Sequence, residues 1–579
     1  MFSILKKRTI PRLIRQYSSN SPKSTNYLYY TALSVGFISV GYYIGINSKN
    51  STPIATPSRS TSPLSTLTTP QYANDSKFNI AFEQIKQIVG DSNITFEEEV
   101  LLSHNDSFFS THHPPNPQVQ KPKVVVYPNS TEDVSKILKI CNEYKVPLIA
   151  NSGLTSLEGQ NIHTRGPNSI SLSFSRMDKI LQFNPKDLDV VVQPGVGWVE
   201  LDDFLKDQQD SNLMFGPDPG IGANIGGMVG TSASGTNASK YLTMKENVIN
   251  LTVVLPDGTI IKTRQRPRKS AAGYDLTRLF IGTEGTLGVI TEITLKLHVR
   301  PKFEFVSIAS FPTITDAANT AETILSQGVN PNAMEILNEE MMSFVNETNI
   351  DGKSEYLQKP TLFFKIGGPS ISNVQDQFKI IESISSENKC LEFKTSQNQD
   401  ENEELWSARR NGLWSTYQYG TKILKDPEDV QVWTTDVAVP ISKLSITIAE
   451  INQMLIDEGF EGKFSVMGHI GDGNCHFIIL YNSPDYLKVS KAVDKMVFTA
   501  LKYEGTCTGE HGVGIGKRKY LPIELGETSI DLMRHIKKAI DPNTILNPDK
   551  IFKIDPNDDL DEQLEHGNLL EKQNCMYNH

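Results

Sequence analysis

The sequence is poor in cysteine and has no excess of positive charge. Its 579 residues include only five cysteines, which are scattered and form no C-x-x-C pair: Cys141, Cys390, Cys475, Cys507 and Cys575. An odd number at irregular spacing argues against a disulfide framework and against a thiolate zinc site. The net charge is −11, whereas binding to nucleic acid requires clustered lysine and arginine. We therefore expect no nucleic acid partner.

Motifs of three common enzyme classes are also missing. No G-x-G-x-x-G follows a predicted strand and no G-x-x-x-x-G-K-[ST] occurs, so NAD on a Rossmann domain and ATP on a P-loop are disfavoured. The run Gly512-Val-Gly514-Ile-Gly516-Lys517 matches neither pattern. A metal hydrolase remains an alternative, but the chain has no H-E-x-x-H helix.

The beginning of the chain lacks acidic residues. No Asp or Glu occurs before Asp75, while Lys and Arg recur among Ile, Leu and Phe near the N-terminus. This composition is typical of a mitochondrial presequence, which we predict over residues 1–25. A disordered basic tail is the alternative.

The uncharged stretch 26–46 is long enough to cross a membrane. About 20 residues at about 1.5 Å each span a hydrocarbon core of about 30 Å, and tyrosines lie near both ends. We predict a transmembrane helix, with a cleaved sorting signal as the alternative. The preceding basic residues predict anchoring to the mitochondrial inner membrane with the body in the intermembrane space, the matrix being the second choice. Residues 47–73, rich in Ser, Thr and Pro, predict an extended linker.

The first half of the body combines a strand–helix–strand pattern with a glycine-rich stretch. Residues 124–153 predict two strands around a helix capped by Ser130 or Thr131. Residues 216–235 then contain seven glycines, each of which costs about 0.5–1 kcal/mol relative to alanine inside a regular element. Close approach of the backbone to a large flat or phosphorylated ligand would justify them, and a flexible linker is the alternative. The hairpin turn predicted at Asp257-Gly258 favours the folded interpretation.

Five stretches together resemble one known family. They are SGLTSLEG (152–159), SFSRMDKI (173–180), VQPGVGW (192–198), residues 216–241 and residues 266–297. In this order they are similar to the FAD-binding domain of the vanillyl-alcohol-oxidase-type flavoproteins, and within that family to the mitochondrial, cytochrome-linked D-lactate dehydrogenases. The resemblance implies an α+β fold with a PCMH-type FAD-binding domain at 74–300, a substrate or cap domain with a metal site at 301–520, and a C-terminal segment at 521–579 that returns to the FAD domain.

The resemblance also implies which residues bind FAD. They are Ser152, Gly153, Thr155, Ser156, Pro217, Asp218, Gly222, Asn224, Gly226, Gly227, Ser232, Gly235, Asn237, Glu284, Gly288, Ile290 and Asn547. One position departs from the family: Leu154 stands where glycine is usual just before Thr-Ser. A branched side chain there is expected to crowd the pyrophosphate, and it motivates an alternative in which the chain is a membrane-tethered binding protein without flavin.

A predicted hairpin in the second half carries two histidines. If residues 471–474 form the turn, His469 lies directly opposite His476 on one face, and Cys475 points to the other. Two imidazoles on one face can bind a metal ion or simply pack together; Glu510 would complete a ligand set that leaves positions open for substrate. The family motifs H-x-G-D-G-N-x-H and E-H-G imply His469, His476 and Glu510 as metal ligands and His511 as the catalytic base. Zinc suits these atoms, as do manganese and iron.

Two arginines lie among aromatic residues in LWSARRNGLW, residues 405–414. A guanidinium binds a carboxylate through two parallel hydrogen bonds, although a solvated helix face is an equal alternative from the sequence alone. By resemblance, Arg409 is the substrate-carboxylate residue. Relatives that oxidise D-2-hydroxyglutarate have polar groups where this chain has Leu413, Thr434 and Ile478. The resemblance thus implies FAD-dependent oxidation of D-lactate with cytochrome c as acceptor, and D-2-hydroxyglutarate dehydrogenase is the rival activity.

Overall fold

The computed structural model describes residues 60–349 and 355–567. The predicted presequence and the predicted span 26–46 lie outside these ranges. Within them, no helix has both the length and the apolar character needed to cross a membrane. The described residues from Thr61 onward belong to one compact unit.

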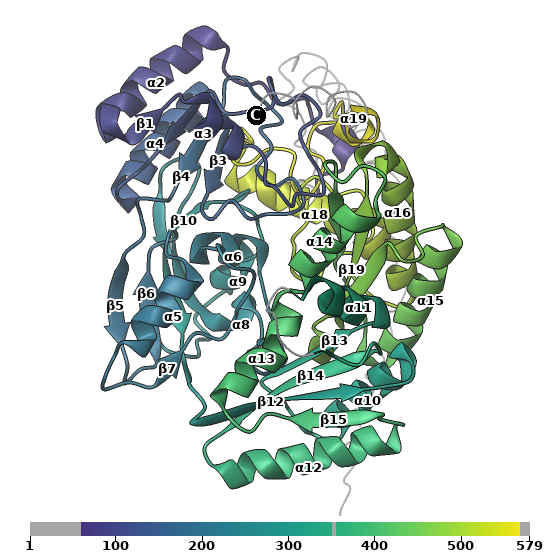
Figure 1. The fold of residues 1–579 in the computed structure, drawn as a ribbon. Coiled ribbons are helices and arrows are strands. Elements are labelled where there is room, and N and C mark those ends of the chain that lie inside the picture. Colours follow the sequence, from purple (N-terminus) through teal and green to yellow (C-terminus); the bar gives the residue numbers. More distant parts are fainter. Residues whose placement is uncertain (1–59, 350–354, 568–579) are drawn as a thin grey trace, which may run out of the picture. The chain divides into compact units, whose positions relative to one another are not determined.

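A small, mostly parallel sheet begins the fold (Figure 1). Its strands are, in spatial order, β1 (Ile94–Thr95), β2 (Val124–Val126), β4 (Ile170–Ser173) and β3 (Leu148–Asn151). The crossover helix α4 (Thr131–Tyr144) packs on it through Ile137, Leu138 and Cys141, and α2 (Asp75–Val89) adds Phe78 and Ile85 to the same core. The predicted cap is confirmed, because the Ser130 side chain accepts a hydrogen bond from the backbone N–H of Asp133.

An antiparallel sheet follows the small one. Its order is β5 (Ile180–Asn184), β6 (Asp189–Val192), β10 (Val289–Lys296), β8 (Val248–Val254) and β9 (Ile260–Lys262). β8 and β9 are joined by the predicted hairpin turn, where the N–H of Gly258 donates to the carbonyl of Leu255. A two-stranded piece pairs β7 (Leu213–Met214) with β11 (His298–Val299). The helices of this region are α3 (Glu98–Ser103), α5 (Trp198–Lys206), α6 (Ile225–Thr231), α7 (Ala238–Tyr241), α8 (Met244–Asn247) and α9 (Leu276–Phe280).

A larger antiparallel sheet dominates the second half. In order, it contains β15 (Glu392–Thr395), β12 (Phe303–Ser310), β14 (Thr361–Gly368), β13 (Ala333–Leu337), β18 (Phe464–Gly468), β19 (Asn474–Tyr481) and β16 (Gln431–Thr434), with β17 (Val437–Ala438) also paired to β19. One face packs against α10 (Ile314–Ser326), α12 (Ile371–Glu387), α15 (Leu444–Asp457) and α16 (Tyr486–Lys502). The other face packs against α11 (Glu339–Thr348), α13 (Gln399–Arg410) and α14 (Gly412–Ile423).

The C-terminal segment passes back to the first sheet. After α17 (Leu521–Leu525) and α18 (Glu527–Ile540), Leu546 forms a parallel bridge with Leu148 of β3. Ile545 and Leu546 are buried in the core of that sheet, and α19 (Leu560–Gly567) ends the described chain. This return brings Asn547 next to the first half of the molecule, where its side-chain N–H donates to the carbonyl of Glu284 at 2.8 Å.

Candidate active site

A cavity of about 1100 Å³ is lined by residues from the two halves of the fold. This is larger than the usual 300–1,000 Å³ of a small-molecule pocket. Most of the predicted FAD residues line it: Ser152, Gly153, Thr155, Ser156, Asp218, Asn224, Gly226, Gly227, Gly235, Glu284, Gly288, Ile290 and Asn547. So do all the residues predicted for metal binding and catalysis: Arg409, His469, His476, Glu510 and His511.

Four predicted FAD residues do not line the cavity, and three of these shape the loops that do. Gly222, at a φ of +95°, places its carbonyl oxygen 2.7 Å from where a Cβ of Gly153 would be. Asn237 donates its backbone N–H to Asp218 at 2.7 Å, and Ser232 ends α6 at a left-handed φ of 58°. Pro217 directly precedes Asp218, which lines the cavity.

The glycines of this wall serve two different purposes. A Cβ at Gly226 would lie 2.5 Å from the ring of Pro194, so glycine there permits the chain segments to pack. At Gly227, in contrast, a Cβ would meet protein only at 3.9 Å. Gly227 lines the cavity and leaves room that a side chain would fill. This wall therefore fits a large, flat ligand.

Two histidines and a glutamate that line the same cavity lie close to one another. Glu510 Oε1 lies 3.0 Å from Nε2 of His469 and 3.2 Å from Nε2 of His476. One ligand atom from each residue lies within 4.8 Å of the others. The opposite ring nitrogens are also held: Nδ1 of His469 is 2.7 Å from Glu335 Oε1, and Nδ1 of His476 donates to the carbonyl of Thr435 at 2.8 Å. Such outer hydrogen bonds orient histidines that bind metals.

The hairpin brings these histidines together by a different register from the predicted one. His476 pairs with Met467, not with His469. β18 ends at Gly468, and a 3-10 turn at Ile470–Asp472 lengthens the connection, so His469 lies in the loop with φ −77° and ψ 70°. The direct pairing was wrong because the sequence pattern gave no sign of the extra turn. The rings still meet, with centroids 5.4 Å apart.

Arg409 lies in the last turn of α13 and is mostly buried. Its Nε donates to Glu335 Oε2 at 2.6 Å. Glu335 thus joins Arg409 to His469, and it projects from the middle of β13 with no exposed surface. Burial raises the pKa of Glu335, but Arg409 and His469 outweigh it and lower that pKa overall. The neighbouring Arg410 is exposed and pairs with Glu403 at 2.8 Å.

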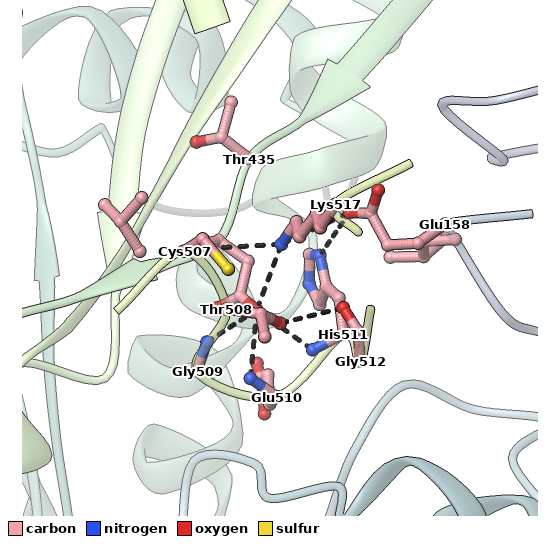
Figure 2. Close-up of polar contacts among 12 residues, drawn as sticks. Glu158, Thr435, Cys507, Thr508, Gly509, Glu510, His511, Gly512 and Lys517 are labelled. Carbon is pink, nitrogen blue, oxygen red and sulfur yellow. Dashed lines mark hydrogen bonds and ion pairs between the residues drawn. The ribbon is translucent and has the colours of Figure 1, made fainter. Parts of the chain in front are cut away.

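The loop that carries Glu510 and His511 (Figure 2) is held by hydrogen bonds to Asp436. Asp436 Oδ2 accepts backbone N–H groups of three successive residues, Gly509 at 2.8 Å and Glu510 and His511 at 2.9 Å. The Thr508 hydroxyl donates to the same oxygen at 2.7 Å. Burial raises the pKa of Asp436, but Lys517 and nearby histidines lower it far below its usual range. Asp436 also forms, with His476 and His511, a second group whose ligand atoms lie close enough to hold a metal ion, but its Oδ2 is already engaged by four short hydrogen bonds.

His511 lines the cavity and stacks on His476, with ring centroids 5.2 Å apart and an angle of 9°. Burial lowers its pKa, which favours the neutral imidazole that can accept a proton. Leu413, Thr434 and Ile478, the positions considered for substrate size, line the same cavity.

Two family models match the chain. The model for the FAD binding domain covers residues 122–264, and the model for the C-terminal domain of FAD linked oxidases covers residues 300–551. The protein named D-lactate dehydrogenase [cytochrome] 1, mitochondrial, from Saccharomyces cerevisiae is 47% identical over 507 residues, which are 87% of this chain and 85% of the yeast protein. The chain belongs to the FAD-linked oxidases of the vanillyl-alcohol-oxidase type.

Other FAD-linked oxidases are similar over comparable lengths. The D-lactate dehydrogenase [cytochrome], mitochondrial, of Kluyveromyces lactis is 47% identical over 86% of this chain and 85% of its own length. The protein of that name from Arabidopsis thaliana is 40% identical over 81% of this chain and 80% of its own length. Among solved structures, 4-ethylphenol oxidase from Gulosibacter chungangensis has a TM-score of 0.67 at 18% identity, covering 85% of this chain and 99% of that one. At this identity it supports the fold alone.

In this FAD-linked oxidase, Leu154 adopts the backbone conformation that glycine would have. Its φ is 56°, and it lines the cavity beside Gly153 and Thr155. The loop therefore keeps its path at a local cost of about 1–2 kcal/mol for a non-glycine residue in the left-handed region.

Three buried carboxylates beside the candidate residues of the FAD-linked oxidase site were not singled out from the sequence: Glu158, Glu335 and Asp436. Only Glu335 had a usable signal, because it is a lone acid in the apolar run Ala-Met-Glu-Ile-Leu, and a buried charge needs a partner. Glu158 and Asp436 lie in loops where acidic residues are ordinary.

Proposed function

We propose that this chain oxidises D-lactate to pyruvate, with FAD as hydride acceptor and cytochrome c as the onward electron acceptor. The observation that carries the proposal is that a single cavity contains a glycine-lined wall, a His-His-Glu cluster and a buried arginine. The names of the yeast and plant relatives support the substrate and the acceptor.

The residues of the cavity fit both groups that the family implies. The wall at Gly227 leaves space for a flat ring system, and two imidazole nitrogens with one carboxylate oxygen suit a divalent metal, with zinc as first choice and manganese or iron as alternatives. When bound, FAD supplies a hydride acceptor and the metal polarises the substrate hydroxyl.

The protein's own side chains bind the substrate, accept its proton and hold these groups in position. Arg409, whose Nε is held by Glu335, offers its terminal nitrogens to the substrate carboxylate. His511 takes the proton of the C2 hydroxyl group as the hydride leaves C2. Glu335 fixes the positions of Arg409 and His469 relative to each other, since it binds both.

The substrate is a short monocarboxylate. Leu413 and Ile478 offer no polar group to a second carboxylate, and Thr434 offers only an uncharged hydroxyl. A buried, unpaired carboxylate would cost several kcal/mol. This favours D-lactate over D-2-hydroxyglutarate.

We further propose that the protein is mitochondrial and attached to the inner membrane through residues 26–46, with its catalytic body in the intermembrane space. The relatives are named mitochondrial. Carbonate extraction of mitochondria tests the attachment: a protein released in the soluble fraction would contradict it.

The function is tested by the absorbance spectrum of residues 74–579, recorded without oxygen before and after substrate. We expect a flavin spectrum that D-lactate bleaches and that L-lactate and D-2-hydroxyglutarate do not. Bleaching by D-2-hydroxyglutarate alone would overturn the argument from Leu413, Thr434 and Ile478. A protein purified without flavin would favour the binding-protein alternative.

Two variants test the residue roles. His511→Ala should retain flavin and metal but lose turnover by about 10²–10⁴-fold, whereas His469→Ala should lose the metal as well, measured by elemental analysis. Full activity in either variant would refute the corresponding role.

A further inference from the structure

Glu158 is a buried carboxylate that faces the proposed base from the opposite half of the fold. It lies in the loop after β3, a few residues beyond the predicted FAD residues Ser152–Ser156, and is 1% exposed. Oε1 of Glu158 is 3.9 Å from Nδ1 of His511 (Figure 2).

Both atoms are enclosed. Among the described residues, His511 Nδ1 is one of the few buried side-chain atoms left without a hydrogen bond, and Glu158 Oε1 has only its ion-pair contact with Lys517. An unsatisfied buried polar group costs about 1–3 kcal/mol. A donor and an acceptor that face each other at 3.9 Å can form a hydrogen bond with a small movement of the imidazole ring, which would satisfy His511 Nδ1.

The run Gly512–Lys517, which matches no nucleotide-binding motif, explains how its loop comes so close to the loop that carries Glu158. A Cβ at Gly514 would lie 2.0 Å from the carbonyl oxygen of Glu158, and one at Gly516 would lie 2.7 Å from Glu158 Oε2. The carbonyl of Glu158 accepts the N–H of Ile515 at 2.9 Å. The loops are thus locked together at the backbone.

Further contacts fix both partners. Gln160 donates a side-chain N–H to the carbonyl of His511 at 2.8 Å. Lys517 Nζ lies 3.2 Å from Glu158 Oε1, and Thr111 donates its hydroxyl to Oε2 at 3.2 Å. Burial raises the pKa of Glu158, but Lys517 and His112 outweigh it and lower that pKa to about 2. The carboxylate is therefore charged.

We propose that Glu158 is the positioning residue of the base: its carboxylate accepts a hydrogen bond from Nδ1–H of His511 and so leaves Nε2 as the nitrogen that faces the cavity. A carboxylate that holds a catalytic imidazole fixes both its tautomer and its orientation. The FAD-binding half thus supplies the group that orients a base carried by the other half. The inference rests on the proposed role of His511.

A double-mutant cycle tests the proposal in the full flavoprotein. The rate of flavin reduction by D-lactate is measured without oxygen in Glu158→Gln, in His511→Ala and in the double variant. Glu158→Gln should slow reduction by about 10- to 100-fold, with the D-lactate dissociation constant changed less than about threefold. In the His511→Ala background the same substitution should change the rate by less than about twofold, because the group that it positions is gone.

Two further variants separate positioning from simple charge balance. Glu158→Asp keeps the negative charge in this part of the site but moves the carboxylate away from His511, so we expect a loss similar to that of Glu158→Gln. Thr111→Val removes the hydroxyl that contacts the other carboxylate oxygen, Leu157 and His112, but leaves Oε1 and His511 in place, so flavin reduction should stay close to the parental rate. Flavin and metal contents are measured in every variant to identify misfolding.

Three results would overturn the inference. They are an equal loss on Glu158→Gln with and without His511, a parental rate in Glu158→Gln, and a parental rate in Glu158→Asp, which would assign Glu158 to charge balance with Lys517. A parental rate in His511→Ala alone would instead remove the proposed base, and the inference would fall with it.

Discussion

Replacing Asp436 with asparagine should release the loop that carries Glu510 and His511. Asp436 is 1% exposed, and its Oδ2 accepts three backbone N–H groups and the Thr508 hydroxyl. Its other oxygen accepts from Asn474 Nδ2 at 2.7 Å. In the variant, Asn474 can flip, because its own Oδ1 has no partner. The new amide oxygen can then face the loop, so the substitution chiefly removes the charge.

The size of the effect follows from the donors that surround this oxygen. Hydrogen bonds to a charged group contribute about 1.5–3 kcal/mol each and neutral ones about 0.5–1.5 kcal/mol. Weakening four of them by about 1 kcal/mol each gives about 4 kcal/mol. Opening of the loop should therefore become about 10³-fold more frequent, at about 1.4 kcal/mol for each factor of ten.

Hydrogen exchange followed by mass spectrometry measures this opening directly. Peptides that cover 505–517 should exchange much faster in Asp436→Asn than in the parent, while those from β8 and β10 should not change. Metal content and turnover should fall together, and flavin should remain. Thr508→Val, which removes one of these donors outright, should cost about 1.5–3 kcal/mol, less than the loss of the charge. Unchanged exchange in 505–517 with normal metal content would refute the reasoning.

Two further predictions concern the FAD-binding half. Leu154→Gly should change FAD affinity by less than about threefold, measured by fluorescence titration, because the backbone at φ 56° already follows the path of a glycine; a tenfold gain would mean that the side chain obstructs the cofactor. Burial raises the pKa of Glu284 to about 7, although the N–H groups of Val513 and Gly514 lower it. Between about pH 4.5 and 7, Glu284 keeps its proton in the folded protein but loses it in the unfolded chain. The free energy of unfolding should therefore fall by about 2–3 kcal/mol as the pH rises across this range. Glu284→Gln should abolish that part of the slope in urea unfolding at pH 5 and pH 7.5, and an identical slope in both proteins would contradict the assignment.

Local patterns in the sequence were enough to predict several of the helices, strands and turns. Apolar periodicity and a hydroxyl cap predicted α4, and Asp-Gly predicted the turn between β8 and β9. The alternation of β19 correctly separated Cys475 from His476: Cys475 packs in one core, and the adjacent His476 lines the cavity on the other side. These features depend on neighbours within a few residues, which a sequence displays directly.

The register of the β18–β19 hairpin could not be read in the same way. Whether Gly468 ends a strand or continues it depends on the 3-10 turn at Ile470–Asp472, and that turn packs against α7 and β13. A two-residue change in pairing leaves the apolar alternation unchanged. The sequence pattern therefore fits both registers equally well.

The flavin residues were assigned through the family resemblance. The sequence by itself determined which side chains have the chemical capacity to bind a metal or a carboxylate, because that capacity belongs to imidazole and guanidinium wherever they occur. Only the tertiary structure decided which carboxylates hold them in place. Their partners are far away along the chain. Glu158 is 353 residues from His511, Glu335 is 74 residues from Arg409, and Asp436 is 75 residues from His511. The physical reason is that a carboxylate requires a particular partner only when it is buried away from water, and burial is a property of the folded molecule.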